Sequence, residues 1–482
     1  MERHSTLGGL LALLLLAGCS SPCRAPDLRT LYDRSAQYHD EHRNPVIVIP
    51  GILGSRLTDG PTGRVVWGAF AGDYANPNDP EGARLVALPM RSGAPLAELR
   101  DGVTSPGVLD RLKVEFLGLP VEQAAYLNIL RVLGVGGYRD EELGLKAIDY
   151  GKDHFTCFQF PYDWRRDNVE NARKLHEFIL EKKAYVQREI EKRFGVKDRD
   201  VQFDIVAHSM GGLIARYYLM YGAQELPAEG PPKPTWEGRR HVDRVILVGT
   251  PNAGSIEAVF QQKDGIRFAS ILPKYEAAVL GTFPSIYQLF PRVRHKPLVY
   301  AEDRSRSAGD FYRVEFWEKL GWGLASREQD PVLQVLLPDV SDPAERRRIA
   351  LDHLRKCLER AERFAAALDA PAAPPAGVSL YLLAGDAKPT SAVAHVDGTA
   401  RRIVKVEKGP GDGTVLRTSA LLDERQGRPW SPSLVSPIRW RQVMFLFSDH
   451  LGMTKDPAFT DNVLYLLLDD PRESYHAAGE RS

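Results

Sequence analysis

The chain has 482 residues, and its 63 lysines and arginines balance 63 aspartates and glutamates, so the formal net charge is zero. This balance gives no indication of a nucleic-acid partner or of attraction to anionic lipid over the whole surface, because both favour an excess of basic residues. The histidines, cysteines and acidic residues show no metal-ligand spacing. We therefore expect neither a metal ion nor another cofactor.

The N-terminus is typical of an export signal. An apolar run from Leu7 to Ala17 is shorter than the roughly twenty residues that span a membrane, which favours a signal peptide over an anchor helix. It ends in Leu16-Ala17-Gly18-Cys19, which resembles the bacterial lipoprotein signal, where cleavage leaves a lipid-modified Cys19 as the new N-terminus. An ordinary signal peptide followed by a chance cysteine is the alternative.

This resemblance implies a protein anchored by lipid in the bacterial cell envelope. Ser20 after the cysteine indicates the outer membrane by the family rule for lipoproteins. We predict a signal peptide over residues 1–18 and a polar tether over residues 19–43. The folded body is expected at residues 44–470, followed by a tail at 471–482. After the signal, no apolar run approaches the length of a membrane span.

Predicted strands alternate with predicted helices along the body. Apolar runs predict strands at residues 44–49, 155–160, 242–248, 378–384 and 443–447, and another ends at residue 208. Helices are predicted from Asn168 to a stop at Gly195, from Met210, from Asp342-Pro343 to Leu368, and over about 459–468. This alternation predicts an α/β fold, with a mostly parallel sheet flanked by helices.

Two long stretches interrupt the alternation and are predicted insertions that form a cap or lid. Residues 58–150 are rich in glycine and proline, and Trp67 there fits either an aromatic at a lipid interface or ordinary packing. Residues 254–340 contain several aromatic residues that we expect at the surface. Between these stretches, Tyr162-Asp163-Trp164-Arg165 is interpreted as an ion-paired structural corner beneath the cap.

The segment Val201–Met220 predicts the nucleophile of a serine hydrolase. An apolar run leads into Ala207-His208-Ser209-Met210-Gly211-Gly212, and a helical pattern follows at once. A sharp strand-to-helix turn of this kind exposes a serine and requires small residues two positions before and after it, here Ala207 and Gly211. The helix that begins at Met210 directs free N–H groups toward a developing oxyanion. We therefore predict Ser209 as the nucleophile of an α/β-hydrolase fold.

A serine nucleophile needs a base and an acid that orients the base, and on this fold they follow the serine in the order acid, then histidine. Of the twelve histidines, His450 is best placed, after the last strand and before the last helix. His395, expected in a loop, is its rival, whereas the side chain of His208 should point away from the serine. For the acid, Asp386 and Asp412 fit equally well on these grounds.

Five segments occur in an order typical of one family. They are PVIVIPGILGSRL at 45–57, YDWR at 162–165, AHSMGG at 207–212, GTPNAGS at 249–255 and GDGTV at 411–415, with FPS and LFP between 283 and 291 as a weaker sixth. With these segments the chain resembles the lecithin:cholesterol acyltransferase family, which includes lysosomal phospholipase A2-type enzymes. The resemblance extends over about residues 44–468.

The resemblance assigns roles to residues of this chain. It implies that Asp412 is the acid, that His450 is the base, and that the backbone N–H groups of Ile52 and Met210 form the oxyanion hole. Animal members of the family close a lid loop with a disulfide, and residues 58–135 contain no cysteine, so that lid is not expected here. Cys157 and Cys357 are interpreted as buried thiols, with a bridge between them as the alternative.

The expected activity is transfer of an acyl group from a phospholipid or another acyl lipid, through an acyl-enzyme, to water or to an alcohol. Water as acceptor gives a phospholipase or lipase, and an alcohol gives an O-acyltransferase. The alternatives are a general carboxylesterase for small soluble esters and a non-catalytic binding protein of the envelope. The retention of all three predicted triad residues argues against the last of these.

Overall fold

The computed structural model describes residues 28–69, 72–109, 111–116, 119–124, 126–142, 154–227, 229–267 and 272–472. The predicted signal peptide, Cys19, the first part of the predicted tether and residues 473–482 lie outside the described residues. Within the described ranges, no helix has both the length and the apolar character needed to cross a membrane.

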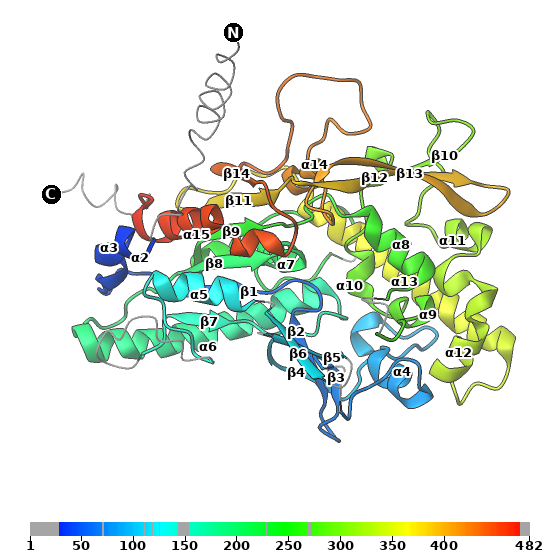
Figure 1. Ribbon diagram of the computed structural model, residues 1–482, viewed down its shortest axis with the longest axis horizontal. Helices are drawn as coiled ribbons and strands as arrows, with labels where there is room; N and C mark the ends of the chain where they lie inside the picture. Colours follow the sequence, from blue (N-terminus) through cyan, green and yellow to red (C-terminus); the bar gives the residue numbers. More distant parts are fainter. Residues whose placement is uncertain are drawn as a thin grey trace, which may run out of the picture.

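Six parallel strands form the central sheet, in the order β14–β11–β9–β8–β1–β7 (Figure 1). Their bounds are β1 (Val46–Ile49), β7 (Cys157–Gln159), β8 (Phe203–His208), β9 (Val242–Val248), β11 (Ser379–Gly385) and β14 (Gln442–Leu446). Every residue of β1, β8, β9 and β11 is buried, as expected for parallel strands that are covered on both faces. The predicted α/β fold with a mostly parallel sheet is confirmed.

Alternate residues of each strand face opposite sides of the sheet and enter two separate apolar cores. Val46 and Val48 of β1 belong to the core shared with α5 (Leu127–Val135) and α15 (Pro457–Leu464). Ile47 and Ile49 belong to the larger core, which contains residues of α6 (Asn168–Phe194), α7 (Met210–Tyr221) and α13 (Pro343–Leu368). Helices therefore cover both faces of the sheet.

The long helices begin and end at the signals that the sequence contains. The Asp167 carboxylate accepts a hydrogen bond from the Val169 N–H at the start of α6, and Gly195, with φ of 73°, ends the helix. Asp342 caps α13 in the same way, followed by Pro343 in the first helical position. These boundaries agree with the prediction because they depend on local chemistry alone.

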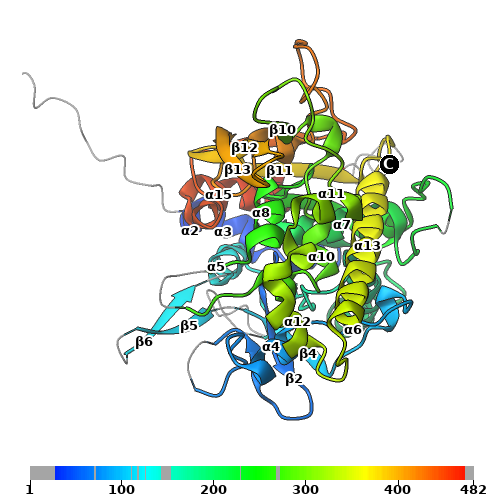
Figure 2. The ribbon, with the colours of Figure 1, turned by 90° about the vertical axis from the view of Figure 1, so that its right-hand side faces the viewer.

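The first insertion builds a small antiparallel sheet beside the main one. Its strands are β2 (Ser55–Asp59), β3 (Val65–Trp67) and β4 (Val103–Val108), followed by the hairpin of β5 (Arg111–Phe116) and β6 (Leu119–Ala124), which projects from the body in Figure 2. Short helices lie at Pro80–Val86 (α4) and Leu96–Glu98 (η1). Trp67 is buried against Trp164 and donates to the Leu53 carbonyl at 2.8 Å, so packing, not a lipid interface, explains this tryptophan.

The second insertion is mostly helical, and the expectation of surface aromatics there is wrong. Phe283, Tyr287, Phe290 and Trp317 are fully buried, and Phe290 stacks on Trp317 with ring centroids 5.8 Å apart. Aromatic side chains bury the largest apolar areas, and these rings belong to the larger core that also contains Ile47 and Ile49 of the sheet. Its elements are α8 (Ile256–Asp264), α9 (Ala277–Leu280), α10 (Pro284–Tyr287), η3 (Val293–His295), β10 (Leu298–Tyr300), α11 (Val314–Leu320), η4 (Gly323–Ala325), η5 (Arg327–Gln329) and α12 (Asp330–Leu336).

The corner at residues 162–165 is ion-paired as predicted. Arg165 is fully buried, and its guanidinium contacts Asp163 at 2.7 Å and Asp101 at 2.8 Å. Burial raises the pKa of Asp163, but the facing Arg165 more than offsets this and holds the pKa of the carboxyl below its usual range. The Trp164 indole donates to the Ser55 carbonyl at 3.2 Å, which joins the corner to the first insertion.

A hairpin that the sequence did not predict lies between β11 and the last strand. It consists of β12 (Lys388–Asp397) and β13 (Arg402–Gly411), which join β10 in a third sheet, and α14 (Arg417–Leu421) follows. His395 therefore lies in a strand and not in the expected loop. It is buried, and its Nε2 lies 3.0 Å from a Glu407 carboxylate oxygen.

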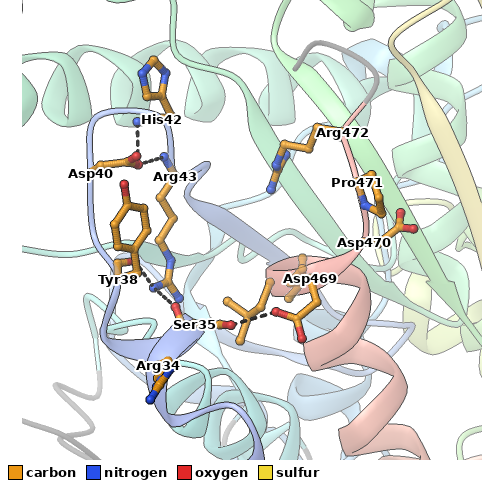
Figure 3. Close-up of a pocket in the computed structure, with 12 residues that line it drawn as sticks. Arg34, Ser35, Tyr38, Asp40, His42, Arg43, Asp469, Asp470, Pro471 and Arg472 are labelled. Carbon is orange, nitrogen blue, oxygen red and sulfur yellow. Dashed lines mark hydrogen bonds between the residues drawn. The ribbon is translucent and has the colours of Figure 1, made fainter. Parts of the chain in front are cut away.

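The two ends of the described chain pack against each other. Residues 28–37, expected to be tether, form α2 (Leu28–Leu31) and α3 (Asp33–Gln37), and the Tyr32 hydroxyl donates to the Asp461 carboxylate at 2.7 Å. Beside this contact, a cavity of about 650 Å³ lies between residues 34–43 and residues 467–472. The second of these segments begins within the π-helical turn Tyr465–Asp469 (η7), which follows α15. Figure 3 shows Ser35 reaching Asp469 across the cavity, at 2.8 Å.

Candidate active site

Ser209 lies on a strained turn between β8 and α7. Its φ of 52° and ψ of −125° are unusual for a residue with a side chain and cost about 1–3 kcal/mol. The turn is held by a hydrogen bond from the Ser209 N–H to the Val248 carbonyl at 2.8 Å. The strain directs the serine side chain out of the sheet at the carboxyl end of β8.

Close backbone contacts explain the small residues around the serine. A Cβ on Gly211 would lie 2.3 Å from the Pro50 carbonyl oxygen, and one on Gly51 would lie 2.8 Å from the Ser209 Cβ. Real Cβ atoms do not approach other atoms so closely, so glycine is required at both positions. The loop after β1 therefore lies directly against the nucleophile turn.

The structure brings Ser209, His450 and Asp412 into one hydrogen-bonded row. The His450 Nε2 lies 3.1 Å from the Ser209 Oγ, and its Nδ1 lies 2.7 Å from the Asp412 Oδ2. A carboxylate only accepts, so the proton of the ring is on Nδ1, and Nε2 is free to accept from the serine hydroxyl. This is the tautomer that a general base for Ser209 needs.

The Asp412 carboxylate is fixed by its own turn. Its Oδ1 accepts hydrogen bonds from the N–H groups of Thr414 at 2.9 Å and Val415 at 2.7 Å, and its other oxygen is left for His450. The His450 N–H also donates to the Asp412 carbonyl at 2.9 Å. Asp412 and His450 are thus held together through both side chain and main chain.

The rival candidates make other contacts. Asp386 pairs with Arg417 at 2.7 Å, and its N–H donates to the Leu446 carbonyl. The ring of His208 is buried and lies 3.2 Å from the His450 carbonyl oxygen, through Nε2, and 3.1 Å from the Tyr126 hydroxyl, through Nδ1. Of the two aspartates, only Asp412 contacts His450.

Two main-chain N–H groups close to Ser209 in the fold have no acceptor among the described residues. Ile52 follows Gly51 in the loop after β1, and Met210 is the first residue of α7. Among the described residues, no hydrogen bond uses the N–H of either residue. The first N–H groups of a helix have no partner within the helix, so Met210 is available as a donor to a ligand.

Two features of the site escaped the sequence-based prediction. Tyr126 precedes α5 within the first insertion, and its hydroxyl accepts a hydrogen bond from the Gly51 N–H at 2.7 Å. Phe447 and Leu451 flank His450 in the chain and are 85% and 60% exposed. No local pattern in the sequence marks Tyr126, but the two apolar residues beside His450 are visible in it.

Residues 124–316 match the family model of lecithin:cholesterol acyltransferase. The matched segment contains Ser209 and the corner at 162–165, and it ends before Asp412 and His450. No curated protein sequence matches the chain.

Several solved structures are similar to this chain at low identity. The match to a chain in the crystal structure of the Tle4–Tli4 complex covers 88% of this chain and 98% of that chain, with 16% identity and a TM-score of 0.49. The mature Bacillus licheniformis lipase BlEst2 covers 89% and 94%, with 13% identity and a TM-score of 0.29. EstA from Clostridium botulinum covers 89% and 88%, with 13% identity and a TM-score of 0.34.

Proposed function

We propose that the protein is a serine-dependent acyl hydrolase or O-acyltransferase that acts on phospholipid or a related acyl lipid. The observation that carries the proposal is the row from Ser209 through His450 to Asp412, at 3.1 and 2.7 Å. Close to it are the N–H groups of Ile52 and Met210, which have no acceptor among the described residues. A nucleophile, an oriented base and oxyanion donors are together the requirements for acyl transfer.

The first step forms an acyl-enzyme. His450 Nε2 takes the proton from the Ser209 hydroxyl as Oγ attacks the ester carbonyl carbon, and Asp412 stabilises the imidazolium that results. The carbonyl oxygen becomes an oxyanion that accepts from the N–H groups of Ile52 and Met210. One such donor is typically worth about 3–4 kcal/mol of barrier. The tetrahedral intermediate collapses, and His450 gives its proton to the departing alkoxide.

The second step reverses these roles with a new nucleophile. His450 removes a proton from water or from an alcohol, whose oxygen attacks the acyl carbonyl. The bond from the acyl carbon to the Ser209 Oγ then breaks, and His450 returns the proton to Oγ. Water yields a free fatty acid, and an alcohol yields a new ester. The triad residues act in the same way in both cases, so the acceptor depends on the groups around the site.

Two observations support a lipid as the acyl donor. The family model that matches residues 124–316 is named for a lipid acyltransferase. Phe447 and Leu451 also place exposed apolar surface on both sides of His450 in the chain, where an acyl chain would approach.

The test is turnover of phosphatidylcholine vesicles by the purified protein, with and without a long-chain alcohol, followed by separation of free fatty acid from new ester. We expect fatty acid or ester to form, and we expect Ser209→Ala to lower kcat by about six orders of magnitude. Near wild-type activity of Ser209→Ala would overturn the mechanism. Turnover of short soluble esters with none of vesicles would instead favour the carboxylesterase alternative.

We also propose that Cys19 carries the lipid that holds the protein at the envelope, because Leu16-Ala17-Gly18-Cys19 resembles the bacterial lipoprotein signal. Several acyl chains on one residue anchor a protein stably, whereas one chain binds marginally. In cells that are fed radiolabelled palmitate, the wild-type chain should carry label and sediment with membranes. Cys19→Ala should lose the label; a labelled Cys19→Ala variant would contradict the anchor.

A further inference from the structure

The loop after β1 and the loop that carries His450 are joined by a buried chain of hydrogen bonds. The Gly51 N–H donates to the Tyr126 hydroxyl at 2.7 Å, and that hydroxyl lies 3.1 Å from the His208 Nδ1. The His208 Nε2 lies 3.2 Å from the His450 carbonyl oxygen. Two side chains thus connect the residue before one oxyanion donor to the residue that acts as base.

The direction of each hydrogen bond follows from its partners. A carbonyl oxygen only accepts, so the His208 Nε2 carries the proton and its Nδ1 accepts from the Tyr126 O–H. The Tyr126 oxygen in turn accepts from the Gly51 N–H. Every donor and acceptor in this series of hydrogen bonds has a partner, as groups this deeply buried require.

The direction of these hydrogen bonds stays the same as pH changes. Burial, together with the nearby His450, lowers the pKa of His208 to about 3, so the ring is neutral at working pH. Burial also raises the pKa of Tyr126, so its hydroxyl keeps its proton. Within the part of the chain that the structure describes, no hydrogen bond joins either side chain to the Ser209 hydroxyl, so neither takes part in the proposed proton transfers.

We propose that Tyr126 and His208 are positioning residues that hold the oxyanion loop and the His450 loop in register across Ser209. The inference rests on the proposed function and goes beyond it, because Tyr126 belongs to the first insertion. The Tyr126 hydroxyl thereby connects that insertion to the catalytic geometry. The fit is close, since a Cβ on Gly51 would lie 2.8 Å from the Ser209 Cβ and 3.2 Å from the Tyr126 hydroxyl.

The first variant to test is Tyr126→Phe, which leaves the Gly51 N–H and the His208 Nδ1 without partners. Small displacements of catalytic groups can cost up to about 100-fold in rate. We expect kcat for a soluble aryl ester to fall about 10-fold or more, with KM within about twofold. The affinity for an alkyl boronic acid, which mimics the oxyanion intermediate on Ser209, should fall with kcat.

The matched control is Tyr221→Phe. Tyr221 is also buried, on the last residue of α7, and its hydroxyl donates to the Ala367 carbonyl at 2.9 Å. Removal of the Tyr221 hydroxyl also deletes one buried hydrogen bond, but this bond is not one of those that join the two loops. We expect a similar loss in melting temperature with kcat and boronate affinity unchanged.

His208 gives a second, independent variant if Tyr126→Phe does not fold. His208→Gln keeps an N–H donor for the His450 carbonyl and should retain more activity than His208→Leu, which has none. Tyr126→Phe with kcat and boronate affinity equal to those of Tyr221→Phe would overturn the inference, as would equal activity of the Gln and Leu variants. A wild-type protein that neither turns over esters nor binds the boronate would instead contradict the proposed function.

Discussion

Hydrogen bonds from its own turn orient the Asp412 carboxylate toward His450. Two N–H groups of its own turn bind one oxygen, so the other oxygen has a single direction available, toward His450. Asp386, which directly follows β11, instead forms an ion pair with Arg417. The difference between the two aspartates lies in hydrogen-bond partners and not in their distance from a strand end.

This difference predicts unequal effects of the same substitution. Asp412→Asn should lower kcat by about four orders of magnitude, because an amide can hold the wrong tautomer of His450. Asp386→Asn loses one partly exposed ion pair and should leave kcat close to that of the wild type. The measurement is steady-state hydrolysis of an aryl ester by both variants. A larger loss in Asp386→Asn would reassign the acid.

Among the secondary-structure elements, α7 packs against the loops that follow β1 and β9. Gly211 faces the Pro50 carbonyl, and a Cβ on Gly212 would lie 1.9 Å from the Thr250 Oγ1. Two successive glycines thus let the first turn of the helix approach the backbone after β1 and the Thr250 side chain after β9. Ser209 is therefore positioned by helix packing as well as by its own strained turn.

Gly212→Ala tests this packing. Overpacking of a buried site typically costs about 1–3 kcal/mol, and we expect a loss of that size in the free energy of unfolding by urea. Thr250→Ala removes the nearest atom, so the double variant should be more stable than the sum of the single effects predicts. Additive losses would show that the helix does not contact Thr250 in solution.

Elements with local signals could be predicted from the sequence, and elements defined by pairing could not. The caps of α6 and α13 and the buried run of β9 are properties of adjacent residues. The strand β13 ends in Lys408-Gly409-Pro410-Gly411, residue types that are depleted in strands, and it exists because it pairs with β12. The aromatic residues of the second insertion were misjudged for the same reason, since their partners are distant in sequence.

The same distinction applies to the site. Ser209 has a local signature, and His450 follows from the order of elements on an α/β sheet. The choice of Asp412 needed the family resemblance, because two aspartates had equivalent positions. Tyr126 could not be predicted, because its role depends on how an insertion without clear periodicity folds back over the loop after β1.

For the whole molecule, buried histidines make stability depend on pH. Burial lowers the pKa of His353 to about 4, and its ring contacts the Thr282 carbonyl at 3.1 Å. The unfolded chain binds this proton near pH 6.5, whereas the folded protein resists binding until about pH 4. The unfolded state therefore holds more protons in this window, and stability falls as pH decreases from 6.5 to 4.

His353→Gln should remove this contribution while an amide N–H preserves the bond to Thr282. We expect the free energy of unfolding to fall less steeply between pH 6.5 and 4 than in the wild type, by at most about 1.4 kcal/mol per pH unit. Urea titrations of both proteins across this range measure the difference. Parallel curves would mean that the pKa of His353 is not lowered in the folded protein.

The position of β1 has a consequence for how the chain folds. Although β1 is the first strand of the sheet, it lies inside it, between β7 and β8, and pairs Val46 with Cys157 and with Asp204. Neither neighbour exists until more than a hundred residues have followed it along the chain. Contacts between segments so distant in sequence form slowly. We expect β1 to remain without a strand partner until β7 and β8 are made, and the turn at Ser209 to form together with the centre of the sheet.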